Sequence, residues 1–185
     1  MIAVLARAAL PTSRAIRWTP IAGASALLLV AAMLTAASGR PADLLPAVAA
    51  AALASLLVGS LHDPAHDLLA PVPVSAMQRR ALRLALMGGA VLLVWTALGL
   101  LAQTSPAATA VGSLLALAAS GVAVAVWGPA RTGVLLGAVV PVLWFAVDQA
   151  VPGGGLAADL VGLWRTDPWP VVAVALVVCL MGRHR

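Results

Sequence analysis

Six long runs of apolar residues divide the chain, and short polar breaks separate one run from the next. The runs lie at about residues 20–38, 44–60, 84–102, 107–127, 132–147 and 169–181. They have 13 to 21 residues each, and a helix of about 20 residues crosses a hydrocarbon core of about 30 Å when it is tilted little. The pattern predicts an all-α polytopic membrane protein with six transmembrane helices in a single domain, residues 1–185.

The arginines predict how these helices are oriented. Six crossings place both termini on one side of the membrane, and only Arg40 and Arg165 then fall on the other side. The arginines on the terminal side are Arg7, Arg14, Arg17, Arg79, Arg80, Arg83, Arg131, Arg183 and Arg185. Because cytoplasmic loops carry an excess of basic residues, we expect an N-in/C-in topology.

Two further segments are too short or too polar to cross the membrane. Residues 1–18 predict a cytoplasmic interfacial helix that Pro11 limits to a few turns. A cleaved signal peptide fits this segment poorly, because Arg7 interrupts its apolar stretch. Residues 148–168 predict an extracellular or re-entrant segment with a short helix from Leu156 to Trp164.

Tryptophans and glycines add detail to this picture. Trp18 and Trp127 suit the inner headgroup layer, and Trp164 and Trp169 suit the outer one. The G-x-x-x-G pair at 133 and 137 permits close helix contact, first within the chain and second between two copies.

Composition narrows the function. The chain is 63% hydrophobic and 9% charged, whereas soluble domains carry about 25% charged residues. It contains no lysine, which excludes a G-x-x-x-x-G-K phosphate loop, and no glutamate, which excludes the general base of a zinc-protease helix. We expect no catalytic activity and no cofactor in this chain. The net charge of +5 points to anionic lipid rather than to nucleic acid.

One polar segment, residues 61–83, interrupts the apolar pattern between the second and third runs. It carries two of the three histidines, His62 and His66. Their spacing of four suggests a metal pair on a helix, but Asp63-Pro64 is typical of a helix start and separates the two histidines. We therefore expect no metal site here.

The rest of this segment predicts a helix, a rigid kink and a second helix. Pro71 and Pro73 end the first helix, and Ser75 with Gln78 forms a capping box that starts the third span. Arg79, Arg80 and Arg83 follow and are expected at the headgroup level. A segment of this kind is suited to transmit force between the membrane helices and a partner bound at the cytoplasmic face.

Intramembrane enzymes and ion-driven transporters fit less well. The histidines lie outside the apolar runs, and the runs carry almost no ionisable side chain. Asp148 comes closest, at the end of the fifth run, where we expect it to cap a loop.

The segment Asp63-Pro-Ala-His-Asp-Leu-Leu-Ala-Pro-Val-Pro-Val-Ser75, followed by Arg79, Arg80 and Arg83, resembles the permease subunits of ABC-2 type transporters, especially small actinobacterial ones. Its place between spans two and three, and the re-entrant piece between spans five and six, also match that family. The family often has glutamates where this chain has Asp63 and Asp67, and the chain is short for a six-span permease.

The resemblance implies a cytoplasmic coupling helix that fits a cleft of an ATP-binding subunit. The implied contact residues are Asp63, His66, Asp67, Leu68, Leu69 and Pro73, with Arg79 and Arg80 as membrane-surface anchors. ATP and Mg are then expected on two copies of the partner subunit, and a second permease copy, identical or paralogous, completes the exporter. The expected location is the bacterial plasma membrane, in contact with its lipid, and the uncharged spans suggest an apolar or amphipathic substrate.

A second hypothesis is a non-transporting membrane scaffold or assembly subunit of a larger complex. In that case the segment at 61–83 binds a partner without any link to ATP hydrolysis.

Overall fold

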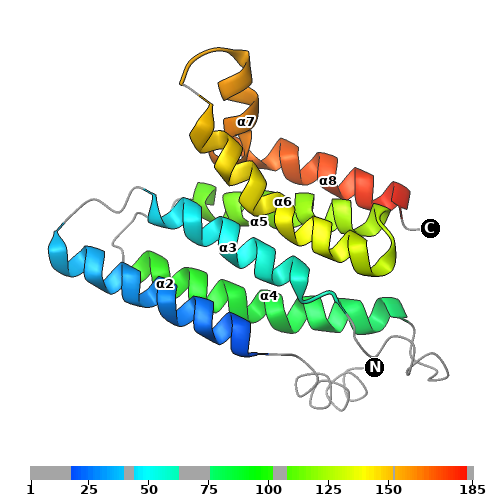
Figure 1. The fold of residues 1–185 in the computed structure, drawn as a ribbon, viewed down its shortest axis with the longest axis horizontal. Helices are drawn as coiled ribbons and strands as arrows, with labels where there is room; N and C mark the ends of the chain where they lie inside the picture. Colours follow the sequence, from blue (N-terminus) through cyan, green and yellow to red (C-terminus); the bar gives the residue numbers. More distant parts are fainter. Residues whose placement is uncertain (1–17, 40–43, 63–75, 102–107, 152, 183–185) are drawn as a thin grey trace.

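A computed structural model describes residues 18–39, 44–62, 76–101, 108–151 and 153–182 (Figure 1). Within these ranges every regular element is helical, and no strand occurs. The helices are α2 (Thr19–Ser38), α3 (Leu45–Gly59), α4 (Ala76–Leu101), α5 (Ala108–Trp127), α6 (Ala130–Ala150), α7 (Leu156–Thr166) and α8 (Pro168–Gly182). The predicted interfacial helix at 1–18 lies, apart from Trp18, outside the described residues.

The helices coincide with the predicted apolar runs, and α7 coincides with the predicted short helix. The third helix begins at Ala76, directly after the position predicted to cap it. The main difference is at the end of α6, which continues to Ala150 and so includes Asp148. The apolar runs and the predicted capping position therefore located the ends of the helices to within a few residues.

Among the described residues, three helical stretches are long and apolar enough to cross a membrane: Thr19–Ser38, Ala81–Leu101 and Thr132–Ala150. A fourth is possible if α7 and α8, which meet at an angle of 86°, form one broken span. The helix Leu45–Gly59 and the stretch Val111–Trp127 are apolar but shorter. The protein is thus a helical membrane protein, and the number of six crossings stays a prediction.

Helix α3 lies at the centre of the bundle. It contacts α2 and α4 on one side and α5 and α6 on the other (Figure 1). Small side chains on α3 and α5, including Ala50, Ala54 and Ala116, are fully buried where these helices meet. Because small residues let helix backbones approach closely, these alanines allow α3 and α5 to pack close together.

The helices alternate in direction, so the bundle has two distinct ends. Ile21 at the start of α2 and Met87 in the first half of α4 pack against Leu56 and Leu57 near the end of α3. Val58 and Leu61 at the end of α3 also pack against Val134 near the start of α6. We call this the proximal end, and we call the end where α3 begins and α6 finishes the distal end.

The last helix follows the same alternation. A Cβ atom added to Gly112, near the start of α5, would lie 2.5 Å from Cγ of Pro168 at the start of α8. A Cβ atom on Gly182, at the end of α8, would lie 2.7 Å from Val126 at the end of α5. Helices α5 and α8 therefore run parallel, and both finish at the proximal end.

Helices α5 and α6 cross in backbone contact. A Cβ atom added to Gly121 would lie 2.6 Å from the carbonyl oxygen of Gly137 and 2.8 Å from Val58 of α3. A Cβ atom on Gly133 would lie 2.8 Å from the carbonyl oxygen of Ala125. The predicted use of Gly133 and Gly137 in packing within the chain is confirmed, and α5 already covers both residues.

Candidate functional site

The predicted coupling residues lie in the connection between α3 and α4. Asp63, His66, Asp67, Leu68, Leu69 and Pro73 fall outside the described residues, and Arg79 and Arg80 are described only as backbone in the first turns of α4. Their contact with an ATP-binding subunit stays a prediction. The structure does describe both ends of this connection.

A buried arginine joins the two ends of the connection. Nη1 of Arg83 on α4 donates a hydrogen bond of 3.2 Å to the backbone carbonyl of His62, just beyond the end of α3. Arg83 is only 7% exposed, so its side chain is buried in the bundle, and its level relative to the lipid headgroups stays a prediction. Its position on α4 faces the bundle, and its long apolar stem packs there while the guanidinium reaches a carbonyl. The residue before the segment at 63–75 is therefore linked to α4, the helix that follows the segment.

Replacing Arg83 with methionine tests this link. Methionine keeps most of the apolar stem but leaves the His62 carbonyl without this donor, so we expect the free energy of unfolding to fall by about 1–3 kcal/mol. Denaturant titration of the purified protein in micelles measures the change. Replacing the exposed Leu93 of the same helix with methionine is the control and should change stability by less than about 0.5 kcal/mol. Equal stability of the two variants would contradict the link.

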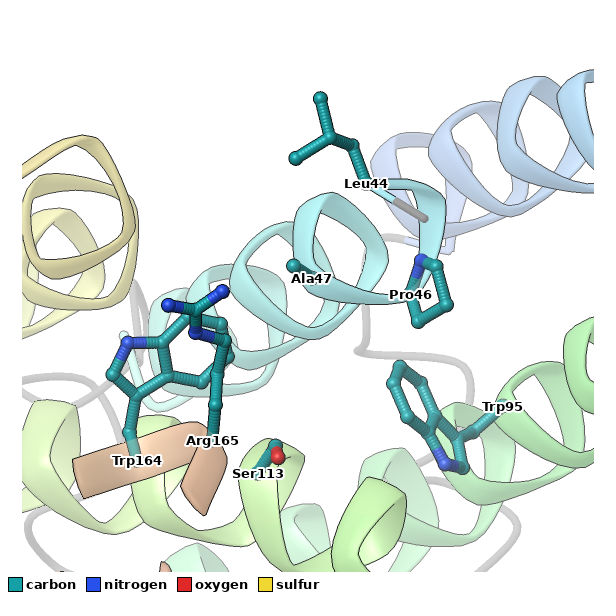
Figure 2. A pocket seen from close by; sticks show the side chains of 7 residues that line it. All are labelled: Leu44, Pro46, Ala47, Trp95, Ser113, Trp164 and Arg165. Carbon is teal, nitrogen blue, oxygen red and sulfur yellow. The ribbon is translucent and has the colours of Figure 1, made fainter. Parts of the chain in front are cut away.

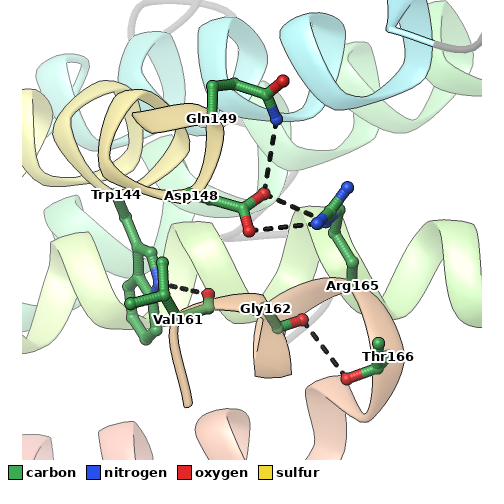
Figure 3. A network of polar contacts seen from close by, with 7 residues as sticks. All are labelled: Trp144, Asp148, Gln149, Val161, Gly162, Arg165 and Thr166. Atoms are coloured by element: carbon green, nitrogen blue, oxygen red, sulfur yellow. Dashed lines mark hydrogen bonds and ion pairs between the residues drawn. The ribbon is translucent and has the colours of Figure 1, made fainter. Parts of the chain in front are cut away.

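A polar site at the distal end was not predicted. Arg165 of α7 contacts Asp148 of α6 through two nitrogens, with Nε 3.0 Å from Oδ2 and Nη2 3.0 Å from Oδ1 (Figure 3). The Asp148 side chain is 4% exposed and the Arg165 side chain is 47% exposed. A guanidinium and a carboxylate in this two-pronged geometry form a strong, directional ion pair. The expectation that Asp148 caps a loop is therefore wrong.

The same region holds α7 against α6 in a second way. Nε1 of Trp144 donates a hydrogen bond of 2.9 Å to the carbonyl of Val161 (Figure 3). Between the two helices the chain reverses through Gly154 and Gly155, with φ angles of 113° and 97°. Glycine adopts such angles without the steric penalty that a side chain brings. The glycines thus allow the chain to turn, and the two side-chain contacts hold α7 against α6.

Trp164 is buried within the bundle. It is 1% exposed and belongs to the main core cluster, whereas Trp169 is exposed. Its Nε1 has no hydrogen-bond partner in the described structure, and its ring lies 5.7 Å from the Arg165 guanidinium carbon. Leu156 and Leu160 of the same helix are exposed, so α7 directs its tryptophan inward and these leucines outward. Trp164 therefore packs in the core and is not exposed to surrounding lipid headgroups.

A cavity of about 160 Å³ adjoins this polar site (Figure 2). Four helices and the residue before α3 contribute to its walls. The lining residues are Leu44, Pro46, Ala47, Trp95, Ser113, Trp164 and Arg165. Most of this lining is apolar, and Ser113 and Arg165 supply its hydroxyl and guanidinium groups.

The described residues offer no cluster of side chains suited to metal binding. Among them, no three His, Cys, Asp or Glu side chains lie together as ligands for a metal ion. Both carboxylate oxygens of Asp148 face Arg165, so this ion pair connects α6 to α7. The distal site can hold α7 in place and can border a bound molecule.

Comparison with known proteins identifies no relative: no family model, no curated protein and no solved structure matches the chain. Its function is therefore argued from its residues and its fold.

Proposed function

We propose that the chain is the transmembrane subunit of an ATP-driven exporter of the ABC-2 type in a bacterial plasma membrane. In this proposal a separate subunit binds ATP and Mg and hydrolyses the nucleotide, and the chain itself is not catalytic. Two six-span permease subunits, each with both termini in the cytoplasm, enclose a path for an apolar or amphipathic substrate.

The observation that carries the proposal is the hydrogen bond between Arg83 and the His62 carbonyl. A coupling segment transmits force only if its ends are attached to elements that move together. Here the attachment joins α4 to the end of α3, and α3 contacts four other helices. A push on the segment at 63–75 would consequently reach the centre of the bundle.

Two further observations support the proposed topology. With alternating helix directions, the proximal end gathers the starts of α2, α4 and α6, where the clusters of arginine are expected. Arg165, one of the two arginines expected on the opposite side, lies at the distal end, where it pairs with Asp148. This distribution of arginines agrees with the excess of basic residues that favours cytoplasmic termini.

The test is assembly with an ATP-binding subunit. We expect that changing Asp63, Leu68 and Leu69 together to alanine lowers co-purification and complex-dependent ATP hydrolysis by about tenfold or more, as loss of a central contact cluster does. The matched control changes Asp159, Leu156 and Leu160 to alanine. These residues are exposed on α7 and have the same side-chain types, so this variant should assemble normally.

Two outcomes would change the account. Normal hydrolysis and assembly of the variant at 63, 68 and 69 would remove the coupling role. If the variant at 63, 68 and 69 instead fails to bind a partner protein that does not hydrolyse ATP, the scaffold hypothesis is favoured.

A further inference from the structure

The distal cavity has the size of a site for one small ring. Its volume of about 160 Å³ is close to that of an apolar cavity of about 150 Å³ that binds benzene. Trp95 and Trp164, both buried, lie on opposite sides of it, and Pro46 and Ala47 complete the apolar wall (Figure 2). Aromatic walls offer a ring favourable stacking or edge contacts.

The polar part of the lining favours a neutral ligand. Arg165 directs Nε and Nη2 to Asp148, and a guanidinium has further N–H groups on Nη1 for an acceptor. The positive charge of Arg165 is already balanced by the buried Asp148 carboxylate. A ligand anion would bring a second negative charge to this pair, whereas a hydroxyl or carbonyl oxygen accepts a hydrogen bond without adding charge.

From this geometry we propose that the distal cavity binds a small, uncharged amphipathic molecule with one aromatic ring or short acyl segment and one hydroxyl or carbonyl group. The ring lies between Trp95 and Trp164, and the oxygen accepts a hydrogen bond from Arg165. Leu44, which is exposed, stands at the edge of the cavity (Figure 2). This site does not depend on the exporter proposal, since the chain binds such a molecule with or without an ATP-binding subunit.

The test uses benzyl alcohol with a photoreactive diazirine on its ring, added to the purified full-length chain in micelles. We expect labelling next to Trp95 or Trp164 that excess benzyl alcohol suppresses and that the same concentration of benzoate suppresses much less. Labelled positions are read by mass spectrometry of the digested protein. The competition uses the wild-type chain and so does not depend on any variant folding.

A pair of variants on α3 locates the site. Ala47→Leu places a larger side chain in the cavity and should lower the competed labelling by about tenfold, because the added atoms occupy the volume that a ring needs. Val48→Leu, on the neighbouring exposed position, should leave it unchanged. Labelling that benzyl alcohol does not suppress, or that spreads over exposed apolar residues of several helices, would show partition into the micelle only and overturn the proposal. Equal competition by benzoate would overturn the neutral-ligand assignment.

Discussion

Replacing Arg165 with leucine should lower the free energy of unfolding by about 3–5 kcal/mol, one of the two largest single effects that we expect in this chain. The reason is the difference in exposure between the partners. Without Arg165, the carboxylate of Asp148 is left with 4% of its side chain exposed and without a counter-charge. Denaturant titration in micelles, with tryptophan fluorescence as the signal, measures the loss.

The reverse change should cost much less. Asp148→Asn leaves behind an arginine that is 47% exposed and therefore stays hydrated, so we expect a loss of about 1 kcal/mol. The double variant, Asp148→Asn with Arg165→Leu, should regain most of the stability that Arg165→Leu loses, because no buried charge remains. Equal costs for the two single changes, or additive costs in the double variant, would show that the pair does not fasten α7.

The second large effect is expected where α5 crosses α6. Gly121→Ala or Gly137→Ala places a methyl group against a backbone carbonyl of the facing helix, and no side-chain rotation relieves that contact. The helices must separate, and we expect a loss of about 3 kcal/mol or a failure to fold. The same titration measures it, supplemented by the yield of monodisperse protein.

Gly88 provides the matched control. A Cβ atom at this position on α4 meets nothing within 4 Å, so Gly88→Ala should leave stability unchanged or raise it by about 0.5–1 kcal/mol. If Gly121→Ala were tolerated as well as Gly88→Ala, backbone contact between α5 and α6 would not be what holds this crossing together.

The helices were predictable because a membrane imposes one length and one polarity on each apolar run. Runs of apolar residues predicted the positions of α2 to α6 and α8, and a short apolar helix between Gly155 and Trp169 predicted α7. The same signal did not settle the number of crossings, since α3 and α8 have only 15 residues each. Helix length identifies a membrane crossing only when the helix is clearly long enough to span the hydrocarbon core.

The distal site was not predictable from local pattern. Asp148 and Arg165 are 17 residues apart, with a glycine turn between them, and neither residue alone indicates that α7 folds back onto α6. The burial of Arg83 and Trp164 was missed for a related reason. Arginine and tryptophan are frequent at membrane interfaces, and only the packing of α4 and α7 turns these two side chains into the bundle.

The central claim is that the segment between α3 and α4 contacts an ATP-binding subunit. Its most direct test is disulfide or bifunctional cross-linking from Leu68→Cys, in a background with Cys179→Ala, within the purified complex. Ala157→Cys, exposed on α7 at the distal end, is the matched control. We predict that only Leu68→Cys cross-links to the ATP-binding subunit and that its yield changes when ATP is added. Cross-linking from Ala157→Cys but not from Leu68→Cys would contradict the account.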